Sequence, residues 1–288
     1  MDRFMVNKRL LGVFAHPDDE GVMSGAILHY ATTGVETGLV YATRGEVGEI
    51  SDPALATPAN LGQVREQEMR AAADVLGVHD LWFLDYRDSG MAGTAENQHP
   101  LAFVQQREAD AIGKLVAIIR SYRPQVMVTF DESGGYGHPD HIAIYRYATA
   151  AYHAAADAAL YPELGSAYAV SKLYYGSFPR SAIKLMMEWL STQMNEDDED
   201  TSVFRGTDPN KLGLPDDQID VRLDVSQWRE TKDRSWAMHR TQMSPNDMMG
   251  QIPQELRHKW QNFEYYHLAT SRVGPDEAGE NDLFARIG

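Results

Sequence analysis

Short, continuous hydrophobic runs alternate with segments of helical hydrophobic spacing over the first 160 residues. The runs are four to eight residues long and have no polar alternation, which is typical of strands buried on both faces of a parallel sheet. These predicted strands cover residues 10–15, 36–43, 81–84 and 125–130. Together they predict a sheet whose strands are separated by helical connections.

The segments between these strands carry hydrophobic residues at the spacing of one helical face. In residues 21–33 such positions are followed by Gly34, a common helix stop. Further helices are predicted over residues 61–76, 103–122 and 138–159. Alternating strands and helices predict an α/β protein with a Rossmann-like, three-layer fold and a mainly parallel sheet.

The pattern is weaker after residue 160. Strands are predicted at residues 172–177, 219–225 and 264–269, and a helix at 228–240. No internal repeat or long linker divides the chain. We therefore expect residues 1–288 to form a single domain, with a Rossmann-like core at about 8–160 and a carboxyl-terminal part at about 160–288 that shapes the substrate site.

Composition narrows the function classes. The chain has 26 Lys and Arg against 42 Asp and Glu, a formal net charge of −16, which disfavours nucleic acids and anionic membranes as partners and favours a small neutral or cationic substrate. It contains no cysteine, so disulfides and thiolate chemistry are excluded. No hydrophobic run has the length of a membrane span and no signal peptide is recognised, so we expect a cytoplasmic location. The sequence allows a homo-oligomer without indicating one.

An acidic run at residues 195–200 lacks the spacing of a calcium-binding loop, and we interpret it as a solvated loop.

Two loops carry the candidate chemistry. Residues 16–20, His-Pro-Asp-Asp-Glu, follow the first predicted strand, and residues 133–141, which end in His-Pro-Asp-His, follow the strand at 125–130. Both lie at carboxyl ends of strands expected to be central in the sheet, where α/β proteins place their sites. We therefore expect the two loops to converge.

The two loops together carry three histidines and four acidic residues, and imidazole and carboxylate groups are the ligands of catalytic metal ions. A catalytic zinc takes three such ligands and leaves one position open for water, whose pKa it lowers to about 7. The loops supply more than three candidates, which leaves a carboxylate as base and a histidine as acid. The interpretation is metal-assisted hydrolysis of an amide or ester. Spacing alone does not decide between Asp18 and Asp19 as ligand.

The two motifs resemble those of the PIG-L/LmbE-like superfamily of zinc-dependent N-deacetylases, which act on N-acetylglucosamine-containing glycoconjugates. The stretches at 87–91 and 134–137 look most like the branch that deacetylates N-acetylglucosaminyl-inositol in the mycothiol pathway. The similarity extends over residues 10–270 and is strongest before 150. The other similar positions are Arg65 with Glu68, and residues 239–242.

The resemblance implies a role for each matching residue. The implied zinc ligands are His16, Asp19 and His141. Asp18 is implied to be the general base, and His138 the charged histidine that stabilises the oxyanion or protonates the leaving amine. The remaining implied site residues are Tyr136, which polarises the carbonyl, Arg65, which holds sugar or inositol hydroxyls, and Asp88, a substrate contact or a turn residue.

Two residues near these motifs are expected to have supporting roles. We expect Glu20 to act behind the ligands or as a helix N-terminal charge, and His239 to be structural. A set of two histidines and one aspartate also accepts ferrous iron or cobalt.

Three other functions are compatible with parts of the pattern. An amidase acting on a thiol conjugate would use the same site. A dinucleotide-dependent oxidoreductase would need Gly-x-Gly-x-x-Gly after the first strand, where this chain has residues 15–20 instead. A non-catalytic sugar- or metal-binding relative would have no need of Asp18 and His138 beside three ligands.

Overall fold

The structure, a computed structural model, describes residues 8–193, 212–243, 253, 255, 261–274 and 281–288. The acidic run at 195–200 lies outside the described residues.

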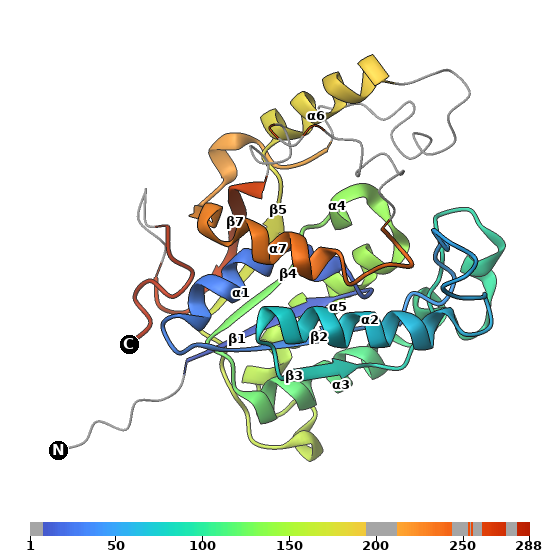
Figure 1. The fold of residues 1–288 in the computed structure, drawn as a ribbon. Coiled ribbons are helices and arrows are strands. Elements are labelled where there is room, and N and C mark those ends of the chain that lie inside the picture. Colours follow the sequence, from blue (N-terminus) through green and yellow to red (C-terminus); the bar gives the residue numbers. More distant parts are fainter. Residues whose placement is uncertain (1–7, 194–211, 244–252, 254, 256–260, 275–280) are drawn as a thin grey trace.

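One seven-stranded sheet forms the centre of the molecule, with the strand order β3-β2-β1-β4-β5-β7-β6 (Figure 1). The strands are β1 (Arg9–Phe14), β2 (Glu36–Tyr41), β3 (Asp80–Phe83), β4 (Val126–Phe130), β5 (Lys172–Ser177), β6 (Val221–Asp224) and β7 (Phe263–Ser271). The five strands from β3 to β5 pair in parallel. β7 pairs antiparallel with both β5 and β6. The predicted mainly parallel α/β fold is confirmed.

Helices cover both faces of this sheet. α1, α2 and α7 lie on the near face in Figure 1 and α3 and α5 on the far face, and α2 packs on α7 as α3 packs on α5. The helices are α1 (Ser24–Ala31), α2 (Leu61–Leu76), α3 (Glu108–Tyr122), α4 (Gly134–Gly137), α5 (Pro139–Ala156), α6 (Arg180–Gln193) and α7 (Arg229–Trp236). The short 3-10 helices are η1 (Asp19–Val22), η2 (Ala95–Gln98), η3 (Phe103–Gln105), η4 (Pro162–Leu164), η7 (Asp216–Gln218) and η8 (Ser226–Trp228).

Three predicted helix boundaries are wrong for physical reasons. The helix predicted from residue 103 begins at Glu108, because Phe103 packs in the core from a separate 3-10 turn and Arg107 has an extended backbone. The helix predicted over 228–240 ends at Trp236, and His239 follows in turns. The helix predicted over 21–33 is split, because Met23, between η1 and α1, has a non-helical backbone with φ of −135°. The sequence pattern did not predict α6.

The strand order creates a crevice between β1 and β4. The chain leaves β1 towards β2 on one side, and leaves β4 towards β5 on the other, so the loops after these two adjacent strands diverge. Ligands of open α/β sheets bind at such a switch point. The two loops singled out in the sequence are the ones that border it.

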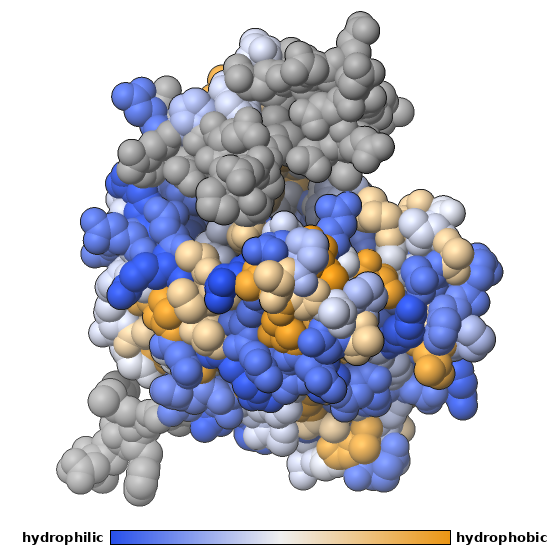
Figure 2. Space-filling view, turned by 45° about the vertical axis from the view of Figure 1, so that its right-hand side comes forward, coloured by the Kyte–Doolittle hydropathy of each residue, from blue (hydrophilic) through white to orange (hydrophobic). Residues whose placement is uncertain are grey.

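The surface agrees with the acidic composition. In the view of Figure 2 hydrophilic residues predominate and hydrophobic ones are interspersed among them. Among the described residues, no helix combines the length and hydrophobicity needed to cross a membrane.

The carboxyl end of α5 is closed by a buried arginine. The Arg120 guanidinium on α3 donates to six backbone carbonyls, and the side chain is 5% exposed. The six acceptors are the carbonyl oxygens of Ala154, Ala155, Asp157, Leu160, Tyr161 and Gly165. These carbonyls include the last ones of α5, which lack helical partners.

We expect Arg120→Ala to lower the free energy of unfolding by about 3 kcal/mol, because it removes this set of charge-assisted hydrogen bonds from a buried position. Urea unfolding at an unchanged slope is the measurement. Arg107→Ala, which changes an exposed arginine at the other end of α3, serves as the control and should cost less than about 0.5 kcal/mol. Equal losses in the two variants would contradict the assignment.

Candidate active site

The loops after β1 and β4 meet at the crevice, where the side chains of both loops line one cavity of about 790 Å³: His16, Asp18 and Asp19 from the first, Tyr136 and His138 from the second. His16, Asp19, His138 and His141 are all at most 9% exposed. The convergence predicted from the sequence is confirmed.

Two imidazole nitrogens and a carboxylate lie close together beside this cavity. His16 Nδ1 is 3.1 Å from His141 Nε2, which is 3.4 Å from Asp19 Oδ1. His16 Nδ1 is also 3.8 Å from Asp19 Oδ2. Ligand atoms about 2.0–2.1 Å from a tetrahedral zinc are about 3.3 Å apart. The two histidine nitrogens therefore have the spacing of metal ligands, and Asp19 turns one carboxylate oxygen towards each of them.

The outer nitrogens of both histidines face oxygen acceptors. His141 Nδ1 is 3.0 Å from Gly134 O, and His16 Nε2 is 3.3 Å from Asp140 Oδ2 and 3.5 Å from Asp88 Oδ1. If those nitrogens carry the protons, the two nitrogens 3.1 Å apart present lone pairs to each other. Only a cation or an added proton between them makes that arrangement favourable. The residues therefore fit a bound metal ion.

The charge distribution agrees with this fit. Burial disfavours a charged His16, but Asp88, Asp140 and Asp19 outweigh burial and raise its pKa well above the usual value. Burial and the neighbouring His16 lower the pKa of His141. This group of side chains therefore stabilises one positive charge but not two.

His138 lies close to His16 and His141, but its Nδ1 accepts a hydrogen bond from the backbone. His16, His138 and His141 form one triplet whose ligand atoms lie within 4.8 Å of one another, and His16, Asp88 and Asp140 form a second. However, His138 Nδ1 accepts a hydrogen bond from Asp140 N at 3.1 Å, which places its proton on Nε2. Burial, followed by the nearby His16 and His141, lowers the pKa of His138 to about 3. This geometry favours a neutral donor over both a ligand and the charged histidine implied by the resemblance.

Asp18 lies between His16 and Asp19 in a strained turn. Its φ is 100°, a left-handed conformation that costs a residue with a side chain about 1–3 kcal/mol. Arg65 Nη2 donates to Asp18 Oδ2 at 3.0 Å and to Pro17 O at 2.7 Å. Burial raises the pKa of Asp18 to about 6, against the opposing effect of Arg65. Burial likewise raises the pKa of Asp19 to about 6, against His16.

Arg65 and Asp88 line the cavity, but both also make bonds within the protein. Arg65 Nη1 donates to Gly45 O at 3.0 Å. Asp88 Oδ1 accepts from Gly90 N at 2.8 Å. Burial of Asp88 favours its neutral form, but His16 outweighs burial and lowers the pKa of the carboxyl. Within the protein, Arg65 thus orients the Asp18 turn, and Asp88 stabilises positive charge on His16.

Tyr136 is the exposed member of the site. Its side chain is 45% exposed, and its ring centroid is 5.0 Å from that of His141 and 6.3 Å from that of His138. Burial, followed by Asp19 and Asp18, raises its pKa, so the hydroxyl keeps its proton. It lies on α4 between Gly135 and Gly137. Both glycines have a positive φ, which residues with an L side chain rarely adopt.

Four further residues contact this region; the sequence assigned only supporting or structural roles to Glu20 and His239 and none to Thr241 and Gln242. Glu20 and His239 form a buried pair next to Asp18, and Thr241 and Gln242 line the cavity. The last three belong to residues 239–242, whose similarity to the family was noted. That similarity was the available signal, but the pattern did not indicate where the segment packs.

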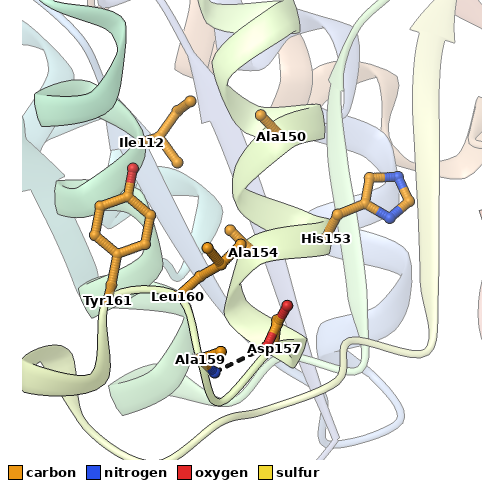
Figure 3. A pocket seen from close by; sticks show the side chains of 8 residues that line it. All are labelled: Ile112, Ala150, His153, Ala154, Asp157, Ala159, Leu160 and Tyr161. Carbon is orange, nitrogen blue, oxygen red and sulfur yellow. Dashed lines mark hydrogen bonds between the residues drawn. The ribbon is translucent and has the colours of Figure 1, made fainter.

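A second cavity, of about 640 Å³, lies between α3, α5 and the loop after α5 (Figure 3). Ile112, Leu160 and Tyr161 gather on one side of it, and the His153 ring points away from them. Asp157 accepts a hydrogen bond from Ala159 N at 2.8 Å. None of its lining residues belongs to the two loops, so it is separate from the candidate active site.

The fold and site define a class of protein. Buried imidazole and carboxylate donors, a neighbouring carboxylate and an open cavity at the switch point of an α/β sheet are the parts of a metal-dependent hydrolase.

Comparison with known proteins identifies the family. Residues 11–152 match the PIG-L family, described as GlcNAc-PI de-N-acetylase. The chain is 38% identical to the 1D-myo-inositol 2-acetamido-2-deoxy-alpha-D-glucopyranoside deacetylase of Geodermatophilus obscurus, over 98% of both chains. It is 40% identical to the protein of that name from Thermobifida fusca, over 98% of this chain and 100% of the relative.

A solved structure shares the fold. It is the N,N'-diacetylchitobiose deacetylase of Pyrococcus horikoshii, with a TM-score of 0.64 and 19% identity over 91% of this chain and 83% of the other. The present chain belongs to the PIG-L family and is a deacetylase, an enzyme that hydrolyses amide bonds.

Proposed function

We propose that this enzyme is a zinc-dependent deacetylase that removes the N-acetyl group from an N-acetylglucosaminyl-inositol-like glycoconjugate. Relatives of 38–40% identity that carry the corresponding name support the substrate class. The single observation that carries the mechanism is the grouping of His16 Nδ1, His141 Nε2 and Asp19 next to Asp18, at a cavity that His16, Asp18 and Asp19 line.

His16, Asp19 and His141 are the proposed zinc ligands. The set fits because Asp19 Oδ2 is fixed by the backbone N–H groups of Ala15 and His16, which leaves Oδ1 facing His141. When bound, zinc supplies Lewis acidity, which acidifies an attacking water and polarises an amide carbonyl. Ferrous iron or cobalt would suit the same donors.

Asp18 is the proposed general base. It takes a proton from the water that attacks the acetyl carbonyl, and the same carboxyl group can return that proton to the leaving amine. His138 presents a neutral Nε2–H because its Nδ1 accepts from Asp140 N, so it stabilises negative charge on the reacting oxygen by donation. The protonated Tyr136 hydroxyl is a second proposed donor to that oxygen.

Arg65 and Asp88 are the proposed contacts to sugar or inositol hydroxyls. Asp88 Oδ2 receives a long contact of 3.4 Å from Val47 N and keeps capacity as an acceptor. Arg65 Nη1 uses one N–H on Gly45 O and has a second to donate.

Acetate release across a panel of amides tests the function. We expect metal-stripped protein to be inactive and one equivalent of zinc to restore acetate release from N-acetylglucosaminyl-inositol, at a kcat/KM at least about 10-fold above that for N,N'-diacetylchitobiose or free N-acetylglucosamine. An amide-containing thiol conjugate completes the panel. Cleavage of that conjugate alone would contradict the proposed substrate, and absence of turnover with zinc bound would contradict the mechanism.

A further inference from the structure

Glu20 makes more polar contacts than its expected supporting role requires. The carboxylate is 2% exposed, and both oxygens are engaged. Oε2 accepts from Asp18 N at 3.0 Å and from Tyr41 OH at 2.8 Å, and Oε1 is 2.6 Å from His239 Nε2. These contacts join the Asp18 turn to β2 and to a segment 219 residues further along the chain.

We propose that Glu20 and His239, together with Tyr41, are positioning residues that hold Asp18 in its left-handed conformation for proton transfer. The proposal rests on the proposed function of Asp18 as the base.

The first argument is the strained backbone of Asp18. A φ of 100° persists only where surrounding contacts over-determine it. Arg65 holds the side chain and the preceding carbonyl, but it makes no contact with the Asp18 N–H. That N–H is held by Glu20 Oε2. Glu20 therefore fixes the backbone group that Arg65 leaves free.

The second argument is the nature of the Glu20–His239 pair. Both side chains are almost fully buried, and a buried ion pair often stabilises a fold no better than hydrophobic residues of similar volume. Glu20 Oε1 and His239 Nε2 lie 2.6 Å apart at 2% and 0% exposure, so each side chain supplies the other's polar partner out of reach of solvent. Each member of the pair therefore needs the other to remain buried. We infer that the pair serves to fix the orientation of the Glu20 carboxylate.

The third argument is where the His239 segment goes next. Thr241 donates from its N and its Oγ1 to Glu68 on α2, and Ser51 N donates to Thr241 O. Gln242 Nε2 donates to Glu49 O. This segment therefore supplies one wall of the cavity and, through His239, one support of the base.

The test compares disruptive variants with conservative ones. We expect Glu20→Ala and His239→Leu each to lower kcat by about 30- to 100-fold, because a misplaced catalytic group of this kind costs up to about 10². KM should change less than about 3-fold, since Thr241 and Gln242 remain, and one equivalent of zinc should stay bound. His239→Gln, which keeps a donor near Nε2, should recover to within about 5-fold. The double variant should be no worse than either single one, because both changes break one chain of contacts.

Lys232→Met is the matched control. Lys232 Nζ is 2.6 Å from Glu264 Oε1 in another buried ion pair of the carboxyl-terminal part, with no contact to Asp18. Its loss should lower stability and leave kcat unchanged at temperatures where the protein is folded. Hydrogen exchange over residues 16–21 is the readout independent of turnover. Exchange at Asp18 N–H should rise in Glu20→Ala and Tyr41→Phe but not in Lys232→Met.

Each outcome is decisive. A kcat for His239→Leu no lower than that of Lys232→Met, or a raised KM at unchanged kcat, would overturn the positioning role. If the wild-type enzyme releases no acetate, the proposed function fails, and the exchange measurement alone decides the positioning. Should Glu20→Ala fail to fold, Tyr41→Phe and His239→Gln provide the comparison.

Discussion

Asp18→Asn is expected to lower kcat for amide hydrolysis by about 10³-fold while one equivalent of metal remains bound. The amide is close in shape to the carboxylate and keeps an oxygen for Arg65, so the turn is retained, but it cannot accept a proton from the attacking water. Acetate release and metal content on the same sample are the two measurements. Retained metal with lost turnover separates a base from a ligand.

Asp85→Asn controls for the unusual backbone. Asp85 also has a positive φ, of 60°, and pairs with Arg44 at 2.7 Å, but it is exposed and lies outside the cavity. Asparagine tolerates this backbone well. We expect Asp85→Asn to retain full activity. If Asp18→Asn instead lost its metal together with its activity, Asp18 would be a ligand and the base would have to be sought elsewhere.

The core of the fold was predictable because its signals are local. Buried hydrophobic runs as short as residues 10–15 and 125–130 are typical of strands covered on both faces, and the intervening helices follow from their periodicity. The placement of β7 between β5 and β6 was not predictable. It depends on antiparallel pairing with strands on both sides, and local patterns do not encode partner choice.

In the site, too, the contacts set by local signals were predictable and those between distant segments were not. His16 and His141 could be placed together because each follows a central strand at the carboxyl edge of the sheet. The partners of Glu20 and Asp88 could not. Glu20 meets His239 across 219 residues, and Asp88 turns an oxygen towards His16 from the loop after β3. Such contacts depend on how separate elements pack, so the sequence did not indicate that His239, expected to be structural, supports the Glu20 carboxylate that holds the Asp18 N–H.

Paired variants of Asp19 and His138 test most directly which of the two is the third metal ligand, the role proposed for Asp19. We expect Asp19→Asn to weaken zinc binding by more than about 100-fold and to abolish turnover, because its carboxylate faces His141 Nε2 while its other oxygen is anchored by backbone N–H groups. His138→Ala should keep one equivalent of zinc and lower kcat by about 10²- to 10³-fold, the cost of losing one donor to the reacting oxygen. Competition with a chromogenic chelator gives the affinity.

The hydrogen bond from Asp140 N to His138 Nδ1 is the reason we expect Asp19, and not His138, to be the ligand. It fixes the proton on His138 Nε2, and a protonated nitrogen has no lone pair for a metal. If His138 were the ligand and Asp19 an outer support, the two results would be exchanged: His138→Ala would lose the metal and Asp19→Asn would keep it. His153→Ala, an exposed histidine on the same helix, should change neither affinity nor turnover. The chelator titration therefore assigns the donor set without reference to any substrate.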